Sequence, residues 1–382
     1  MLISRSDRGL LASWWYTVDR ALLSAVLLLM GMGLLALMAA SPPVAERLGR
    51  DTFHFLNQQL LFLAVAIAVM FTVSFFNVRW IRRCALLTYV VGLLLMLAAL
   101  KYGPEIKGAH RWIDVGPLRL QPSEFVKPAA TILAAWLLGE WVRRPDMPGL
   151  WGALGIYAIF AAMLLSEPDL GQTILISLVF GTVLLVAGIA WIWVLGIIGI
   201  GAGGLFLAYM SLPHVASRID RFLNPDAGDS FQVDKALEAF QNGGFAGTGP
   251  GAGMAKHVLP DAHTDFIFAV VGEEFGIFAC ALIILVIGFV VMRLMVRAIR
   301  EEDPFVALAL TGLGAIFGFQ AAINMMVNVA LVPAKGMTLP FISYGGSSLV
   351  SMAITMGAVL ALSRKRPVAH FPVEMMQAES KP

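Results

Sequence analysis

The chain has 382 residues, of which 59% are hydrophobic and only 14% are charged, and its mean hydropathy is +0.80. A water-soluble domain needs a more polar surface than this composition offers, so the sequence predicts a polytopic membrane protein. The formal net charge is only +2, and the basic residues are scattered, which argues against a nucleic-acid partner.

Charge-poor stretches divide the chain into spans, since about 20 apolar residues cross the hydrocarbon core of a bilayer. They run over residues 21–45, 52–78, 84–100, 128–139, 147–166, 170–217, 275–292, 304–334 and 336–363. The stretch 170–217 is long enough for two helices with a turn near Gly188. We therefore expect an all-α fold of ten transmembrane helices.

Lys and Arg gather in short segments at one end of these spans, at residues 5–20, 79–83, 143–144, 293–300 and 364–366. Cytoplasmic loops are enriched in basic residues, so the tails 1–20 and 364–382 are both expected in the cytoplasm, on either side of one transmembrane domain, 21–363. The longest loops then lie outside, and 212–268 is the largest. Because loops on a rigid scaffold often carry binding and catalytic groups, we expect function on the outer face.

Within the loop 212–268, residues 219–223 and 233–240 are predicted to form short amphipathic helices. The Gly-rich piece 242–253 lacks the Gly-Lys-Ser/Thr ending of a nucleotide-binding loop. A flexible linker is the favoured interpretation. Backbone amides that approach a diphosphate are the alternative.

Three carboxylates, Asp265, Glu273 and Glu274, follow this loop at the entrance to an apolar span. A carboxylate near hydrocarbon is costly unless it faces protein or water, so all three are functional candidates. Asp265 is also a good residue type to cap a helix that begins at Phe266. Glu273 and Glu274 lie about two turns further on, and we interpret them as supporting residues, with Glu274 kept as a site candidate.

Other polar positions recur at helical spacing. Gln320, Asn324 and Asn328 form a stripe on an apolar span, which must face other helices and predicts interhelical hydrogen bonds, with a substrate groove as the alternative. Glu124 and Lys127 are three residues apart and would share a helix face, where a structural salt bridge is the simplest interpretation.

Six motifs in a fixed order carry a family resemblance over about residues 20–365. They are Arg111-Trp112-Ile113, 121–127 (Gln-Pro-Ser-Glu-Phe-Val-Lys), Glu167-Pro168-Asp169-Leu170-Gly171, 221–225 (Arg-Phe-Leu-Asn-Pro), 259–268 (Leu-Pro-Asp-Ala-His-Thr-Asp-Phe-Ile-Phe) and 335–348 (Lys-Gly-Met-Thr-Leu-Pro-Phe-Ile-Ser-Tyr-Gly-Gly-Ser-Ser). The combination resembles the SEDS family of cell-division, elongation and sporulation proteins, and the last two motifs look most like its division branch.

The resemblance implies a peptidoglycan glycosyltransferase of the cytoplasmic (inner) membrane, placed at the division septum. Such an enzyme polymerises lipid II, an undecaprenyl-diphosphate disaccharide-pentapeptide, on the outer face. Its implied partners are a class B penicillin-binding protein that crosslinks the peptides, other division proteins and membrane lipid. An elongation polymerase, a lipid II transporter and a scaffold for the transpeptidase are the alternatives.

The implied site residues follow from the same motifs and from the chemistry. Asp265 aligns with the family's essential aspartate and is the candidate general base. Cations must neutralise the departing diphosphate, and the candidates are Arg111, Lys127, Arg218, Arg221 and Lys335, with interface snorkelling as the alternative. Glu124 and Glu274 complete the predicted substrate-binding set. The scattered His residues predict no built-in metal site, but a divalent cation, Mg²⁺ or Mn²⁺, that bridges diphosphate and carboxylate is chemically reasonable.

Overall fold

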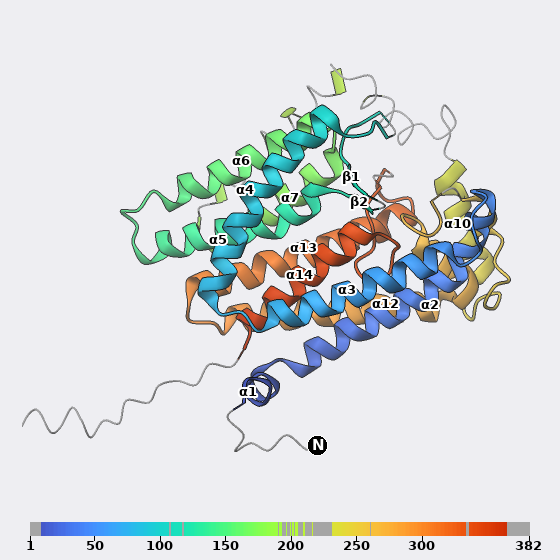
Figure 1. The fold of residues 1–382 in the computed structure, drawn as a ribbon, viewed down its shortest axis with the longest axis horizontal. Helices are drawn as coiled ribbons and strands as arrows, with labels where there is room; N and C mark the ends of the chain where they lie inside the picture. Colours follow the sequence, from blue (N-terminus) through green and yellow to red (C-terminus); the bar gives the residue numbers. More distant parts are fainter. Residues whose placement is uncertain are drawn as a thin grey trace, which may run out of the picture.

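The computed structural model describes residues 9–106, 108–116, 118–189, 231–259, 261–333 and 336–364, with scattered positions between 191 and 216. In this part of the chain, seven helices are long and apolar enough to span a membrane, and two apolar helices of 17 residues join them. The nine are α2 (Arg20–Arg47), α3 (His54–Ser74), α4 (Val78–Tyr102), α5 (Pro122–Arg143), α6 (Gly149–Ser166), α7 (Leu170–Val186), α12 (Ile267–Ile299), α13 (Pro304–Asn328) and α14 (Gly346–Leu362). They form one elongated bundle (Figure 1).

The predicted spans locate these helices, but several boundaries differ. The eighth span was expected from residue 275, whereas α12 begins at Ile267, and the tenth was expected from residue 336, whereas α14 begins at Gly346. Gly188 makes the predicted turn after α7, with φ +86°. The second helix of the 170–217 stretch and the predicted helix 219–223 lie outside the described residues.

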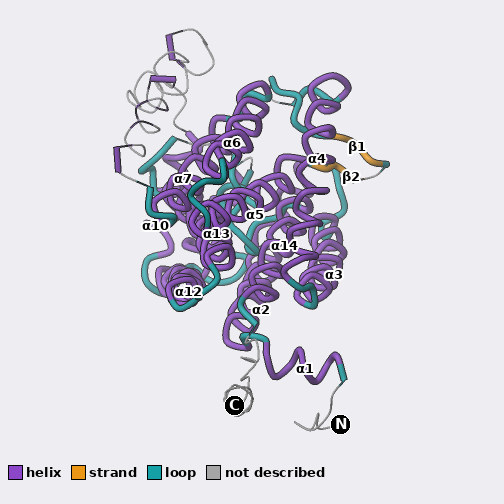
Figure 2. The backbone as a smooth tube through the Cα atoms, turned by 90° about the vertical axis from the view of Figure 1, so that its left-hand side faces the viewer, coloured by secondary structure: helices purple, strands orange, loops and turns teal. Residues whose placement is uncertain are grey.

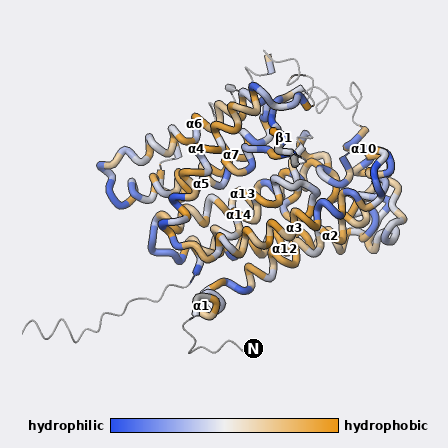
Figure 3. Tube along the Cα trace, in the orientation of Figure 1, coloured by the Kyte–Doolittle hydropathy of each residue, from blue (hydrophilic) through white to orange (hydrophobic). Residues whose placement is uncertain are grey.

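The Arg-rich segments meet at one end of the bundle, as the topology prediction requires. Arg143 at the end of α5 lies 2.8 Å from Asp303, which caps α13. Asp19, the N-cap of α2, pairs with both Arg293 and Arg297 near the end of α12, at 2.8 and 3.1 Å. Figure 3 shows hydrophilic segments at both ends of the helices and a more apolar stretch between them.

Two helices form the centre of the bundle. In its most apolar window α13 is 78% buried and α5 is 67% buried, against 28% or less for α3, α4, α6 and α12. Seen end-on in Figure 2, α13 and α5 lie inside the ring of helices that includes α6, α12 and α3. Gly314 and Gly318 of α13 let Leu294 and Val291 of α12 pack within van der Waals contact, as small residues do between membrane helices.

Shorter elements decorate the bundle. A helix α1 (Leu10–Thr17) precedes α2, while α10 (Phe231–Gly243) and α11 (Ala255–Val258) precede α12. The prediction of an amphipathic helix over 233–240 is confirmed by α10. The all-α prediction holds for the membrane spans, and the sequence did not reveal an antiparallel hairpin of β1 (Ile113–Val115) and β2 (Leu118–Leu120) before α5. A segment outside the bilayer can pair its backbone across strands, since water satisfies the exposed edges.

Candidate functional site

The segment 263–265, just before α12, is held through three consecutive backbone carbonyls. Tyr344 donates its backbone N–H to the His263 carbonyl at 2.9 Å, and the Ser343 hydroxyl donates to the Thr264 carbonyl at 2.6 Å. The Asp265 carbonyl accepts from α13, as described below, and its side chain is partly exposed. Phe266, and not Asp265, is the N-cap of α12, so the capping interpretation of Asp265 is wrong.

The polar stripe of α13 supplies the contacts to Asp265. The side-chain amides of Asn324 and Asn328 both donate to the Asp265 carbonyl, at 3.0 and 2.9 Å. The Asn328 side-chain oxygen accepts the backbone N–H of Ala269 in the first turn of α12, at 3.0 Å. Both asparagines are at most 1% exposed. The predicted role of this stripe in interhelical hydrogen bonding is confirmed.

A non-helical stretch, 336–345, lies against the same segment. Gly336 has φ +64°, and a Cβ placed on it would lie 3.5 Å from Asp265 Oδ2, so this turn is a direct neighbour of the carboxylate. Met337 accepts a hydrogen bond from Asn324 at 2.6 Å, and the Thr338 carbonyl accepts one from Gln320 at 3.2 Å. Hydropathy predicted a span from residue 336, but these contacts satisfy the backbone without a helix, which is tolerated at membrane depth where protein surrounds it.

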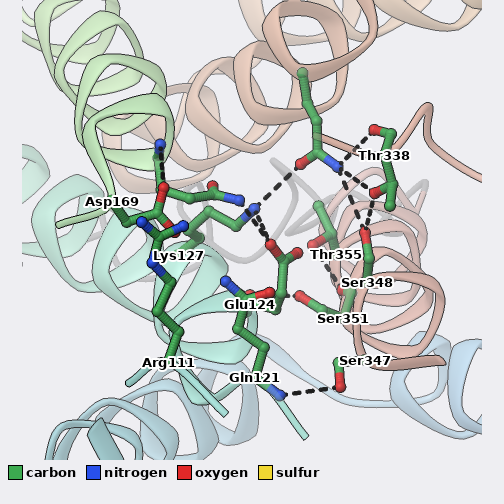
Figure 4. A network of polar contacts seen from close by, with 12 residues as sticks. Arg111, Gln121, Glu124, Lys127, Asp169, Thr338, Ser347, Ser348, Ser351 and Thr355 are labelled. Carbon is green, nitrogen blue, oxygen red and sulfur yellow. Dashed lines mark hydrogen bonds and ion pairs between the residues drawn. The ribbon is translucent and has the colours of Figure 1, made fainter. Parts of the chain in front are cut away.

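A second polar group lies between α5, α7 and α13 (Figure 4). Lys127 Nζ is 2.9 Å from Glu124 and 3.2 Å from the Gln320 side chain, and Gln172 of α7 donates to the same Glu124 oxygen at 2.9 Å. Lys127 and Glu124 are 1% and 5% exposed in their side chains. The predicted Glu124–Lys127 pair is therefore confirmed. In this arrangement the lysine charge is directed at protein groups.

Arg111 lies in the loop before the hairpin and contacts the turn between α6 and α7. Its guanidinium donates to the backbone carbonyls of Glu167, at 2.7 Å, and of Pro168, and lies 3.5 Å from Asp169. Burial raises the pKa of the Glu167 carboxyl to about 8, with help from the Asp169 charge and against the effect of Arg111. Neither Glu167 oxygen has a hydrogen-bond partner among the described residues, which favours the protonated form.

Glu273 and Glu274 hold the Gly-rich segment against α12. Glu274 pairs with Lys256 and accepts the backbone N–H of Gly251 at 2.8 Å, while Glu273 accepts that of Ala255 at 2.9 Å. Both carboxylates are 1% exposed. These contacts fit the predicted supporting role of the two residues.

The Gly-rich segment is an ordered part of the bundle. Helix α12 breaks at Gly276, and the amides of Thr248 and Gly249 donate to the carbonyls of Glu273 and Glu274, at 2.8 and 3.0 Å. A Cβ on Gly247 would lie 2.2 Å from the Glu274 carbonyl oxygen, so only glycine permits this approach. The flexible-linker interpretation is therefore wrong. These two amides bind the carbonyls that the break in α12 leaves without a helical partner.

His263 lies two residues before Asp265 in an aromatic environment. Its ring centroid is 4.6 Å from that of Phe55 in α3 and 5.3 Å from that of Tyr344. Burial lowers the pKa of His263 to about 4, with Asp261 opposing this shift and Arg47 adding to it. The imidazole is therefore neutral at neutral pH and acts as a packing group beside the segment.

Three of the predicted cations, Arg218, Arg221 and Lys335, lie outside the described residues. Among the described residues, no group of three or more His, Cys, Asp or Glu side chains could hold a metal ion. A bound divalent cation therefore stays a prediction. Sequence reasoning did not assign roles to Glu167, Asp169 or Gln172. The motif that contains Glu167 and Asp169 was visible in the sequence, but only the fold brings Asp169 to Arg111 and Gln172 to Glu124.

The fold and the site define a multi-pass membrane protein with a partly exposed aspartate, Asp265, whose backbone is held by asparagines near the end of the central helix α13. The sequence profile of the FtsW/RodA/SpoVE family of cell cycle proteins matches residues 20–367. The chain belongs to this family.

Its relatives are consistent in name and in fold. A protein of Caulobacter vibrioides named "Probable peptidoglycan glycosyltransferase FtsW" is 42% identical over 368 residues, 96% of this chain and 94% of that protein. A protein of the same name from Escherichia coli O6:H1 is 34% identical, over 90% of this chain and 85% of its own.

Two solved structures are similar. A chain of a peptidoglycan synthase complex, studied for how polymerization and crosslinking are coordinated, matches with a TM-score of 0.74 and 27% identity, over 91% of this chain and 98% of that one. The Rod shape determining protein RodA of Thermus thermophilus matches with a TM-score of 0.67 and 26% identity, over 91% and 97%. The protein is a peptidoglycan glycosyltransferase with the fold of this family.

Proposed function

We propose that this glycosyltransferase polymerises lipid II at the outer face of the inner membrane, with Asp265 as the general base. The observation that supports the proposal is the combination of exposure and backbone contacts at Asp265. Its side chain is partly exposed, whereas its backbone is held by two buried amides. A base needs this combination, because it must reach substrate and keep one orientation.

The proposed reaction is a single displacement. Asp265 takes the proton from the 4-hydroxyl of the GlcNAc of lipid II while that oxygen attacks C1 of the MurNAc at the lipid end of the growing strand. The new glycosidic bond forms as the bond from C1 to the undecaprenyl diphosphate breaks, and the anomeric centre inverts. The strand thus grows at its lipid-bearing end.

Charge on the leaving diphosphate requires cations or backbone donors. Arg111, whose side chain is 21% exposed, is the best-placed described candidate, although it also holds the α6–α7 turn. Lys335, Arg218 and Arg221 complete the proposed set from outside the described residues. Glu124 and Lys127 support this site through their buried pair, and Glu274 does so through the loop that it holds.

The cellular setting is the division septum, with a class B penicillin-binding protein as transpeptidase partner. The FtsW names of the relatives and the match to a chain of a peptidoglycan synthase complex support this proposal. The position of the fluorescently tagged protein in dividing cells tests it. Dispersed sites of wall synthesis instead of a septal band would favour an elongation role.

The catalytic assignment is tested with purified protein, its transpeptidase partner and lipid II. Asp265→Asn keeps the size of the side chain and removes its basicity, so the polymerisation rate should fall by about 10²–10⁴, the usual contribution of general base catalysis. The length and amount of glycan strands are measured by gel electrophoresis.

Asp114→Asn is the matched control. Asp114 is an exposed hairpin carboxylate that pairs only across the hairpin, with Arg119 at 2.9 Å, and the same chemical change there should leave the rate unchanged. Equal rates for wild type and Asp265→Asn would show that Asp265 is not the base.

A further inference from the structure

The polar stripe of α13 contacts two separate segments, the Asp265 segment and the non-helical stretch 336–345. Its three members contact different parts of them. Gln320 donates to the Thr338 carbonyl at 3.2 Å, in the non-helical stretch 336–345. Asn328 donates to the Asp265 carbonyl at 2.9 Å and accepts from Ala269, on the same side. Asn324, in the middle, contacts both sides.

The contacts of Asn324 with these two segments are made by one atom. Its Nδ2 donates to the Asp265 carbonyl at 3.0 Å and to the Met337 carbonyl at 2.6 Å. A carboxamide nitrogen carries two hydrogens, so both donors are used. Asn324 thereby joins the segment of the proposed base to the turn that contains Gly336, two stretches of chain about 70 residues apart in sequence.

The spacing that Asn324 sets is close. The Gly336 turn approaches Asp265 so nearly that a Cβ on the glycine would lie 3.5 Å from Oδ2. A small shift of this turn would change the space around the carboxylate. Asn324 is 1% exposed and α13 is the most buried helix, so the anchor point itself is rigid.

We infer that Asn324 is a positioning residue for catalysis: it fixes the Asp265 carboxylate against the Gly336–Thr338 turn in the geometry that proton transfer requires. The inference rests on the proposed role of Asp265. Asn324 contacts Asp265 only through the backbone and takes no part in proton transfer. Its loss therefore changes the alignment of the base and leaves its basicity intact.

Asn324→Ala and Asn328→Ala provide a matched pair. Each removes one donor to the same carbonyl from an equally buried site on the same helix, but only Asn324→Ala releases Met337. Misplacing a catalytic group by about 1 Å costs about 100-fold, so Asn324→Ala should lower kcat by about this factor. Asn328→Ala should lower kcat by less than about tenfold, because the link to the Gly336 turn is kept.

The full chain with its transpeptidase partner is assayed for polymerisation of lipid II, and kcat and KM are separated at equal amounts of folded protein. The thermal midpoint of unfolding is measured for every variant. We expect similar midpoints and similar KM for the two alanine variants, with the difference in kcat. Equal losses of kcat, or losses that follow the thermal midpoints, would assign Asn324 a structural role only and overturn the inference.

Asn324→Ser is the second variant, for the case in which the alanine protein does not fold. The smaller polar side chain leaves room for water at the two carbonyls, and we expect a folded protein with reduced kcat. A serine variant with the kcat of wild type would also overturn the inference.

A double variant separates this inference from the proposed base. If Asn324 acts through Asp265, adding Asn324→Ala to Asp265→Asn should lower the residual kcat little further, because effects of residues that act as a unit are not additive. A full additional loss would contradict the inference. Wild-type activity of Asp265→Asn alone would contradict the proposed base instead.

Discussion

Helix α13 contacts the Glu124–Lys127 network through Gln320 and the Asp265 segment through Asn324 and Asn328, and charged side chains differ between these two regions. In the network, charged side chains are buried and bind one another, with Lys127 1% exposed. Asp265 is a partly exposed residue, the side-chain amides of Asn324 and Asn328 bind its backbone carbonyl, and the Ser343 hydroxyl binds the carbonyl of Thr264.

This difference shows how the bundle keeps a charge available. A carboxylate that also served as a structural partner would lose its basicity to that partner, because a nearby opposite charge favours the ionised form. The backbone carbonyl of Asp265 is held by Asn324 and Asn328, and these two contacts do not use the carboxylate. The Glu124–Lys127 pair, in contrast, uses its charged side chains to join α5 to α7 and α13.

The largest stability effect is expected from Lys127→Met. Removing one member of a buried ion pair leaves an uncompensated charge and costs about 3–5 kcal/mol. The variant should unfold at lower temperature in detergent, measured by a thermal scan.

Adding Glu124→Gln should restore most of this stability, since no charge remains buried. A double variant that recovers stability without activity would show that Lys127 also serves the substrate. Failure of the double variant to recover stability would contradict the structural role of the pair.

A smaller effect, and one that depends on pH, is expected from Glu167→Gln. The folded-state pKa of about 8 lies above the ordinary 4.5, so the contribution of this group is fully present below about pH 4.5 and is lost as pH rises through 8. Glutamine has no proton to lose there. The variant should therefore exceed wild type in stability above pH 8, by about 1–3 kcal/mol.

The measurement is the thermal midpoint of both proteins from pH 6 to about 9, a range that covers the folded-state pKa. Parallel curves for the two proteins would show that Glu167 does not titrate in this window.

The smallest effect is expected from Arg119→Ala, which removes the partner of Asp114 on the hairpin. The two side chains are 55% and 49% exposed, and exposed pairs contribute about 0–1 kcal/mol. Chemical denaturation of wild type and variant measures the difference. A loss as large as that of Lys127→Met would contradict the view that burial, rather than pairing, makes the network important.

Much of the fold was predictable from hydropathy and charge. The spans near α2, α3, α4 and α6 follow from local composition, because the bilayer selects apolar segments of fixed length, and the clustering of arginine at one end of the bundle follows from its spacing between them. The boundaries of α12 and α14 were not predictable in this way. The non-helical stretch 336–345 contains no charged residue, like a span, and its contacts with α13, with the Asp265 segment and within the stretch replace helical hydrogen bonds.

The candidate site divides in the same manner. Asp265, the Glu124–Lys127 spacing and the polar stripe of α13 were visible in the sequence as residue types at particular intervals. Their partners were not, because Lys127 meets Gln320 across 193 positions and Asn324 meets Asp265 across 59.

The sequence by itself determined the membrane class, the family and the identity of the candidate base, and it predicted the orientation, since these depend on composition and on motifs read along the chain. Only the tertiary structure decided that the backbone carbonyl of the candidate base is held by α13, that the Gly-rich segment stabilises the break in α12, and that Asn324 joins two distant segments. The physical reason is that a hydrogen bond is made between neighbours in space, and packing alone chooses those neighbours.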